Sequence, residues 1–351
     1  MSPAPEHDAA GSARHGGWWA RAALQGLGFL LGIGLLWWCI HTAFSRPETR
    51  AELSKLAAAR WWDLAAMVAI SMLAITLDGL MFRAVLQPVK KLPALTMLSV
   101  AGVCSVLSYL PFKASMLFRF VYHTRRDGLP VLTIVAWIIA TGTVLLISLL
   151  PIAGATIVRP QADAVWWGLI AAATVLAAII AHGVCRVTMS IGTARSGSLP
   201  DDPPPLSTLT WHEKLKDAAR MLAQPRSFAQ ALLLRLSIVA LQALRFVLAA
   251  KLMGVAVSPE QALIAGAAYN LIQAISPGGV AGFREAGAAT ALSFLNGPDI
   301  LAVTLTVTAA EAVSNALMGI AGAVYLRIDT LFLRRSASPP LPVQQPAPNS
   351  E

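Results

Sequence analysis

The feature that most constrains this chain is its long apolar runs, because an α-helix needs about 20 apolar residues to cross the ~30 Å hydrocarbon layer of a bilayer. Hydrophobic residues make up 56% of the 351 positions and charged residues only 13%, whereas soluble domains carry about 25% charged residues. This disfavours soluble enzymes, nucleic-acid binders and disulfide-rich secreted folds. We predict an all-α, polytopic membrane protein. Its six full spans are 22–44, 62–82, 129–152, 164–187, 231–253 and 300–326.

Two further apolar segments are each broken by proline and followed by a cation. Residues 93–110 precede the first break, and residues 261–276 precede the second. Sixteen helical residues extend only about 24 Å, which is short for a full crossing. We therefore predict two re-entrant helical hairpins, each entering and leaving on one side. The residues of the breaks with candidate binding roles are Lys113 and Arg119 in the first, and Pro277, Gly278, Gly279, Gly282, Arg284 and Glu285 in the second.

Most of the 27 Lys and Arg residues fall on one side when the N-terminus is placed in the cytoplasm, as the positive-inside rule requires. This predicts an N-terminal cytoplasmic tail at 1–17 and one transmembrane domain at 18–336, which includes a cytoplasmic loop at 188–229. The C-terminal tail, 337–351, is rich in Pro, Ser and Gln, and we predict that it is cytoplasmic and disordered. The net charge of +9 then indicates contact with anionic phospholipids.

The two hairpins belong to units of opposite topology, each made of a span, a hairpin and a span. Pro111 and Pro277 fall at corresponding places, and both Arg119 and Arg284 directly follow a phenylalanine. Interrupted helices at matching positions in two inverted halves indicate a substrate site near the bilayer midplane of a transporter. The alternative is a coincidence between two proline-containing loops.

The break at Pro277, Gly278 and Gly279 suggests an anion site. Broken backbone inside a bilayer persists only where it is buried in protein or lines a wet cavity, and glycine lets a ligand approach the backbone closely. The following helix start offers free N–H groups, and Arg284 could bind a phosphate bidentately. The alternative is a tight turn with an arginine that extends to the membrane surface. At the first break we expect Arg119 to point inward and Lys113 to lie nearer the turn.

Four more ionisable residues fall inside predicted membrane segments. A charge at the bilayer centre costs about 3 kcal/mol, so Asp78 and Glu311 need cationic partners or water, and Arg235 and Arg245 are the available cations. Ten residues separate these arginines by about 80° around a helix, so we expect them to serve different neighbours. We assign all four a coupling or counter-ion role. For Glu311, a proton-coupling role and a structural pair with Arg235 or Arg245 are both open.

Sequence patterns for catalysis or metal binding are missing. The three cysteines, Cys39, Cys104 and Cys185, lie in apolar segments without metal-type spacing, and no phosphate-binding loop, dinucleotide fingerprint or His/Cys cluster occurs. We therefore predict no catalytic residue, no metal and no cofactor. The expected partners are a membrane lipid substrate and anionic phospholipids, with no nucleic acid, and a homo-oligomer is left open.

The stretch from Ser276 to Ala286, SPGGVAGFREA, together with residues 111–119 and the following RRDGL at 125–129, resembles a flippase-like integral membrane family. That family is typified by the transmembrane region of lysylphosphatidylglycerol synthase. Its usual late pattern is one residue shorter than here, where Val280 and Ala281 precede Gly282. Its early pattern usually carries Gly-Glu where this chain has Ser115 and Met116.

The resemblance implies a transporter or flippase that moves a polar lipid, with an anionic phosphate in its headgroup, between leaflets of the bacterial cytoplasmic (inner) membrane. Bifunctional members of the family append a soluble aminoacyltransferase domain, and we expect this chain to lack it and not to be an enzyme. On this reading, alanine at Arg284 abolishes transfer but leaves expression intact. The alternative is an integral membrane enzyme or assembly partner acting on lipid-linked envelope precursors.

Overall fold

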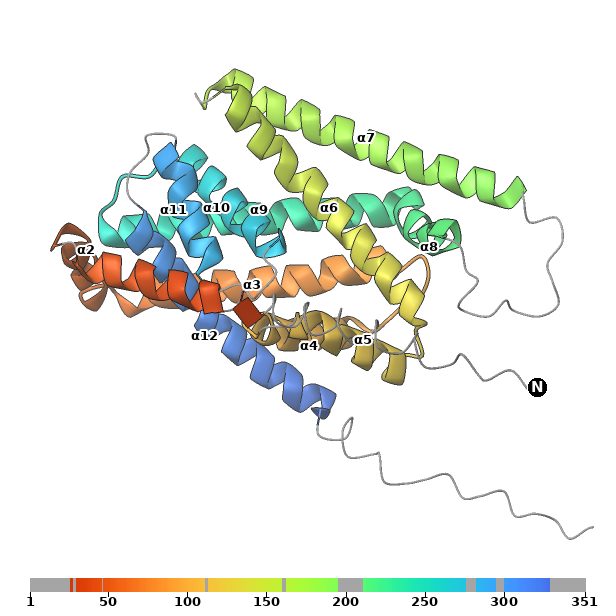
Figure 1. Ribbon diagram of the computed structural model, residues 1–351, viewed down its shortest axis with the longest axis horizontal. Helices are drawn as coiled ribbons and strands as arrows, with labels where there is room; N and C mark the ends of the chain where they lie inside the picture. Colours follow the sequence, from red (N-terminus) through yellow and green to blue (C-terminus); the bar gives the residue numbers. More distant parts are fainter. Residues whose placement is uncertain are drawn as a thin grey trace, which may run out of the picture.

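The computed structural model describes residues 26–27, 30–45, 47–110, 113–159, 162–194, 211–275, 282–294 and 300–328. All regular secondary structure in these ranges is helical, which confirms the all-α prediction. Figure 1 shows the helices of the bundle. They are Leu30–Ser45, α2 (Pro47–Ala57), α3 (Trp61–Leu86), α4 (Ala94–Leu107), α5 (Ala114–Arg126), α6 (Val131–Val158), α7 (Ala164–Ala194), α8 (Trp211–Ala223), α9 (Pro225–Met253), α10 (Pro259–Ile275), α11 (Phe283–Phe294) and α12 (Leu301–Leu326).

Five helices are long and apolar enough to cross a membrane: α3, α6, α7, α9 and α12. They contain 26 to 31 residues each and match five of the six predicted spans. The remaining span, predicted at 22–44, is represented by the shorter apolar helix Leu30–Ser45, and part of its predicted N-terminal half lies outside the described residues. The chain is a multi-pass membrane protein.

The two interrupted segments form two pairs of short helices. The first pair is α4 and α5, with 14 and 13 residues, and the second is α10 and α11, with 17 and 12 residues. The partners in each pair pack against each other. Pro111, Pro277, Gly278 and Gly279 lie outside the described residues. Both segments therefore consist of helices too short to cross the hydrocarbon layer comfortably.

Helix contacts relate the first half, α3–α6, to the second half, α9–α12. Helix α3 packs on α9, the equivalent helix of the other half. The remaining contacts come in matched pairs, because α4 packs on α12 as α10 packs on α6, and α3 packs on α12 as α9 packs on α6. This reciprocal pattern is what two equivalent halves related by a two-fold axis produce.

Glycines allow α4 and α12 to approach closely. A Cβ at Gly102 of α4 would lie 2.5 Å from the carbonyl oxygen of Met318, and a Cβ at Gly322 of α12 would lie 2.4 Å from that of Ser99. Small residues at helix contacts are the usual way in which membrane helices bring their backbones together. This contact joins the two halves of the protein and holds two of the helices that surround the site described below.

The range 188–229, predicted as a cytoplasmic loop, is largely helical where it is described. Helix α7 continues to Ala194, α8 follows, and α9 begins at Pro225; residues 195–210 lie outside the described ranges. The buried face of α8 includes Ala218, Met221 and Leu222, which pack into the same apolar cluster as α6. The basic residues of α8 lie on the same helix as an apolar stripe at helical spacing. Helix α7 lies at the outer edge of the bundle, against α6 and α8 (Figure 1).

Candidate substrate-binding site

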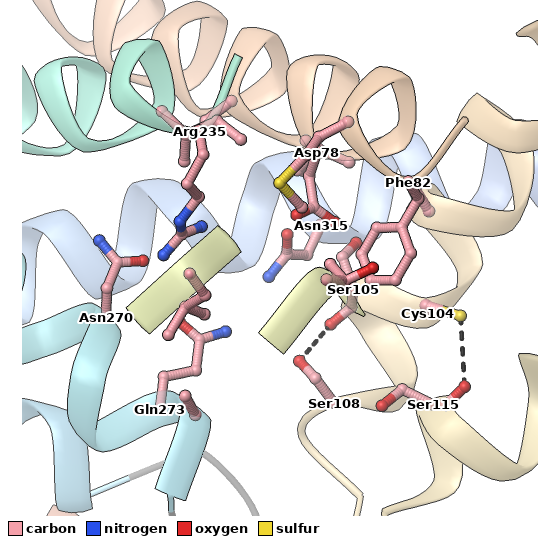
Figure 2. Close-up of a pocket in the computed structure, with 18 of the residues that line it drawn as sticks. Asp78, Phe82, Cys104, Ser105, Ser108, Ser115, Arg235, Asn270, Gln273 and Asn315 are labelled. Carbon is pink, nitrogen blue, oxygen red and sulfur yellow. Dashed lines mark hydrogen bonds between the residues drawn. The ribbon is translucent and has the colours of Figure 1, made fainter. Parts of the chain in front are cut away.

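A cavity of about 420 Å³ lies among α3, α4, α5, α6, α9, α10 and α12. Figure 2 shows side chains from both halves of the protein around this space. Six of the twelve candidate site residues line it: Asp78, Lys113, Arg119, Arg235, Arg245 and Glu311. Among the described lining residues, four side chains are cationic and two are acidic. The cavity therefore carries an excess of positive charge within the membrane helices.

Arg119 and Lys113 occupy the positions expected for them. Lys113 precedes the first residue of α5 and has a left-handed backbone conformation, with φ of 48°. Arg119 is 8% exposed, and its guanidinium carbon lies 3.6 Å from the centre of the Phe82 ring. Its Nη2 lies 3.9 Å from Asp78 Oδ2, and its Nη1 has no hydrogen-bond partner. Asp78 on α3 thus supplies a carboxylate near Arg119, where this chain lacks the glutamate of the usual early pattern.

Arg235 and Arg245 serve different neighbours, as their spacing on α9 predicts. Nη1 of Arg245 donates to Ser71 Oγ at 3.0 Å and to Glu311 Oε2 at 3.3 Å. Arg235 is 5% exposed and forms no ion pair within 4 Å in the described part of the chain, although it interacts electrostatically with Asp78. The Nε atoms of both arginines lack a hydrogen-bond partner. Buried guanidinium donors without partners indicate space for an acceptor that the protein does not supply.

Arg284 lies behind the cavity wall, not in the cavity. Its side chain is fully buried, and all three of its nitrogens have partners. Nε donates to Glu285 Oε1 at 3.0 Å, Nη1 to Glu311 Oε1 at 2.7 Å, and Nη2 to the Tyr109 hydroxyl at 3.2 Å. The Tyr269 ring lies 4.8 Å from the guanidinium carbon. Arg284, which we expected to contact a headgroup directly, is thus bonded to protein groups through each of its nitrogens and does not line the cavity.

Glu311 lies between Arg284, which is behind the cavity lining, and Arg245, which lines the cavity. Its Oε1 accepts from Arg284 and its Oε2 from Arg245, and the Tyr269 hydroxyl also donates to Oε2 at 3.2 Å. The structural pair with Arg245, one of the two readings left open, is therefore present, while Arg235 takes no part in it. A carboxylate shared by two guanidinium groups holds both in fixed positions.

Glu285 and Gly282 build the start of α11. The Gly282 N–H donates to Glu285 Oε2 at 2.6 Å, and Thr308 Oγ1 donates to Glu285 Oε1 at 2.8 Å. This is the glutamate half of a capping box. Gly282 has φ of +85°, and a Cβ there would lie 2.0 Å from the carbonyl oxygen of Gly32. Glu285 thus accepts one of the N–H groups at this helix start, that of Gly282, where the sequence led us to expect an anion. Pro277, Gly278 and Gly279 lie outside the described residues.

Four neutral polar residues that were not among the sequence-based candidates also line the cavity. Gln242 on α9, Asn270 and Gln273 on α10, and Asn315 on α12 all line the cavity. Asn315 also donates to Tyr109, which in turn contacts Arg284. Glutamine and asparagine inside apolar segments could have indicated these positions, because a buried amide is costly unless it finds a hydrogen-bond partner.

The described residues contain no group of three or more His, Cys, Asp or Glu side chains that could hold a metal ion. With four cationic side chains and two acidic ones, the lining of the cavity is suited to an anion. Guanidinium groups bind phosphate oxygens through paired N–H donors, and a lysine adds a point charge. Several neutral donors and acceptors surround these cations.

A family model described as the lysylphosphatidylglycerol synthase TM region matches residues 25–321. The match includes both short helix pairs and every described residue that lines the cavity. Comparisons with curated proteins and with solved structures gave no match. The chain belongs to the family of the lysylphosphatidylglycerol synthase transmembrane region.

Proposed function

We propose that this protein is a lipid translocator that moves a phosphate-bearing polar lipid between the two leaflets of the bacterial inner membrane. The observation that carries the proposal is the cavity among the membrane helices, where Lys113, Arg119, Arg235 and Arg245 converge. Family membership supports a membrane function that involves lipids. The proposal involves no covalent chemistry and no catalytic residue.

Electrostatics favour an anionic headgroup in this cavity. Arg119, Arg235 and Arg245 are buried, and each buried cation costs about 3 kcal/mol in the bilayer on insertion scales. Asp78 and Glu311 offset only part of the charge of these arginines and the exposed Lys113. A headgroup phosphate would supply the missing negative charge and the acceptor oxygens for the unpartnered nitrogens of Arg119, Arg235 and Arg245. The acyl chains would remain in the surrounding lipid.

Transport between leaflets requires that the cavity face each side in turn. In the proposed topology, the α4–α5 pair enters from the cytoplasmic side, the α10–α11 pair enters from the outside, and both termini are cytoplasmic. The reciprocal contacts of the two halves support an inverted repeat. Arg119 would bind the headgroup near the first pair and Arg235 near the second. Glu311 and Arg284 would act as positioning residues for Arg245.

The test uses purified protein in phosphatidylcholine vesicles that contain a trace of fluorescent phosphatidylglycerol. A membrane-impermeant reductant quenches the outer leaflet, so continued loss of fluorescence measures transfer. We expect Arg235→Gln and Arg119→Gln each to slow transfer at least tenfold. The matched control is Arg60→Gln, at an exposed arginine before α3.

Two results would overturn the proposal. One is transfer of the fluorescent phosphatidylglycerol by the native protein no faster than in protein-free vesicles. The other is an unchanged rate in a folded Arg119→Gln, Arg235→Gln double variant. Thermal unfolding in detergent checks that the variants retain their fold, so that a slow rate can be assigned to the cavity.

A further inference from the structure

We infer that Asp78 is a proton-binding residue that couples movement of the anionic lipid to movement of one proton in the same direction. The inference rests on the proposed function and adds a coupling ion to it. It comes from the two arginines that face Asp78, because these are also the arginines with donors left for a bound anion.

The two acids that line the cavity differ in their hydrogen bonds. Glu311 accepts hydrogen bonds from two arginines and from the Tyr269 hydroxyl. Asp78 accepts no hydrogen bond in the described part of the chain, and its ion pair with Arg119 is loose, with 3.9 Å between Oδ2 and Nη2. Hydrogen bonds to a carboxylate favour its ionised form. Asp78 is therefore the acid of the cavity that can exchange a proton without breaking such bonds.

Water can reach Asp78 through the cavity. Its side chain is 34% exposed, and it lines the cavity together with Lys113, which is exposed just before α5. Figure 2 shows Asp78 on α3 and Arg235 on α9 at this space. The carboxylate can thus take a proton from water on one side of the membrane and return it to water on the other.

Charged groups around Asp78 come from several helices. Besides α4, α9 and α12, the helices that pack on α3 include α6 and α8, and neither of these two adds an ionisable side chain to the described lining of the cavity. Two of the lining cations, Arg119 and Arg235, act electrostatically on Asp78. The ionisable side chains that line the cavity with Asp78 are Cys104 on α4, Lys113 and Arg119 at α5, Arg235 and Arg245 on α9, and Glu311 on α12.

An anion and Asp78 share the same cations. Nη1 of Arg119 and Nε of Arg235 have no hydrogen-bond partner. A headgroup phosphate bound there pairs with the cations that face Asp78 and places a second negative charge beside its carboxylate. Both changes favour the protonated form of Asp78. By linkage, protonation of Asp78 favours binding of the anion by the same factor.

Coupled binding also keeps the charge of the cavity constant. A phosphodiester brings one negative charge, and the proton on Asp78 balances it. The loaded and the empty cavity then carry the same net charge, so the membrane potential does not oppose movement of the anionic headgroup. On release the phosphate leaves, Asp78 loses its proton to water on that side, and its ion pair with Arg119 forms again. The lipid therefore moves in the direction in which protons flow.

The experiment uses the purified full chain in the vesicle assay with fluorescent phosphatidylglycerol, where the reductant reports transfer from the inner to the outer leaflet. The external pH is kept constant, and the lumen is set one pH unit more acidic, equal or one unit more alkaline. We expect the acidic lumen to accelerate transfer at least threefold over equal pH and the alkaline lumen to slow it. At equal pH, a potential set by valinomycin and a potassium gradient should leave the native rate unchanged.

Asp78→Asn keeps the size of the side chain but removes the proton site. Its transfer rate should no longer depend on the pH gradient, and a lumen-negative potential should now accelerate it, because the anion moves without a balancing charge. Asp63→Asn, at an acid in the first turn of α3 that does not line the cavity, is the matched control and should behave as the native protein. A purely structural role of Asp78 would lower the rate without exchanging one dependence for the other.

Proton uptake can also be counted at equilibrium. Dioctanoyl phosphatidylglycerol is titrated into the protein in detergent by calorimetry, in two buffers with different ionisation enthalpies. The native protein should take up protons on binding, and Asp78→Asn should take up none. This measurement decides the role of Asp78 even if the variant transports slowly, and a melting temperature shows that the variant is folded.

The outcomes separate this inference from the proposed function. Native transfer that does not respond to the pH gradient, or that an alkaline lumen accelerates, would overturn the coupling and leave an anionic translocator in place. A native response to the gradient, or native proton uptake, in folded Asp78→Asn would overturn the assignment to Asp78. Absence of phosphatidylglycerol transfer by the native protein under every gradient would count against the proposed function itself.

Discussion

At the scale of single residues, Arg284, Glu285 and Glu311 form a connected set of buried charged contacts in the cavity wall. Arg284 donates hydrogen bonds to Glu285, Glu311 and Tyr109, and Glu311 also accepts a hydrogen bond from Arg245. A buried ion pair adds little net stability, but removing one partner leaves an uncompensated charge and is costly. The wall of the cavity is therefore sensitive to any single change within this set.

Arg284→Ala should destabilise the protein by about 3–5 kcal/mol, because Glu285 and Glu311 would stay buried without this cation. Lower expression and a lower melting temperature in detergent are the expected results, in contrast to the intact expression expected from the sequence. Arg60→Ala, at an exposed position, is the control and should be nearly neutral. A native melting temperature for Arg284→Ala would contradict the structural role of this network.

A second residue-scale prediction concerns the link between α6 and α7. Hydrogen bonds from the Arg159 guanidinium and from the Trp166 N–H lower the pKa of Asp163 from its ordinary value of 3.8 to about 2. Because the folded-state pKa is depressed, the stabilisation from this carboxylate is fully present above pH 3.8 and is lost as the pH falls toward 2.

Arg159→Ala should raise the pKa of Asp163 toward 3.8, since the largest cause of the depressed pKa is removed. The measurement is a pH titration of the ¹³C-labelled aspartate carboxyl resonances in detergent micelles. Lys251→Ala, at an exposed lysine that is not among the groups acting on Asp163, should leave the Asp163 titration unchanged. An Asp163 midpoint that does not move after Arg159→Ala would show that the guanidinium contact is absent in solution.

At the scale of elements, the contact of α4 with α12 determines whether the two halves fit together. Gly102→Ala should cost about 1–3 kcal/mol through overpacking, because the new Cβ would lie 2.5 Å from Met318 O and 2.9 Å from Met318 C. Backbone atoms cannot rotate away as a flexible side chain can. Thermal unfolding and the vesicle transfer assay should both show the loss, since both helices line the cavity.

The matched control for this substitution is Gly168→Ala in α7, where an added Cβ meets no atom within 4 Å. Alanine is the better helix former by about 0.5–1 kcal/mol, so this variant should be neutral or slightly more stable. Equal effects of the two substitutions would mean that helix propensity, and not the approach of α4 to α12, governs stability.

At the scale of the whole molecule, the proposed inverted repeat makes a topological prediction. Single cysteines are placed in a chain whose native cysteines, Cys39, Cys104 and Cys185, are replaced by alanine. Lys91→Cys and Arg126→Cys flank α4 and α5, and both should react with a membrane-impermeant thiol reagent from the cytoplasmic side. Ala256→Cys lies before α10, and Ser293→Cys lies near the end of α11. Both should react with the reagent only from the opposite side.

All four positions are exposed, so labelling reports sidedness and not burial. Labelling of Lys91→Cys and Arg126→Cys from opposite sides would show that the α4–α5 segment crosses the membrane. Labelling of both pairs from one side would remove the inversion of the two halves. Either outcome would require a different route for the lipid headgroup.

The sequence alone was sufficient for the class of fold and for the positions of most spans. A bilayer offers no hydrogen bonds, so apolar runs of sufficient length must be helical, and their length decides which can cross. The two broken segments were also predictable as pairs of short helices, because proline interrupts the helical hydrogen bonds. Asp78, Lys113, Arg119, Arg235, Arg245 and Glu311 could be recognised as site candidates because charge inside a membrane is rare.

Only the tertiary structure decided which of these charges meet and which face the cavity. Helical periodicity tells which residues share a face, but it does not tell which face meets which neighbour. Arg284 looked equivalent to Arg119, yet packing against Glu285, Glu311 and Tyr109 placed it in the wall. The amide cluster around Arg235 likewise exists only because α9, α10 and α12, distant in the sequence, present their polar residues to one space.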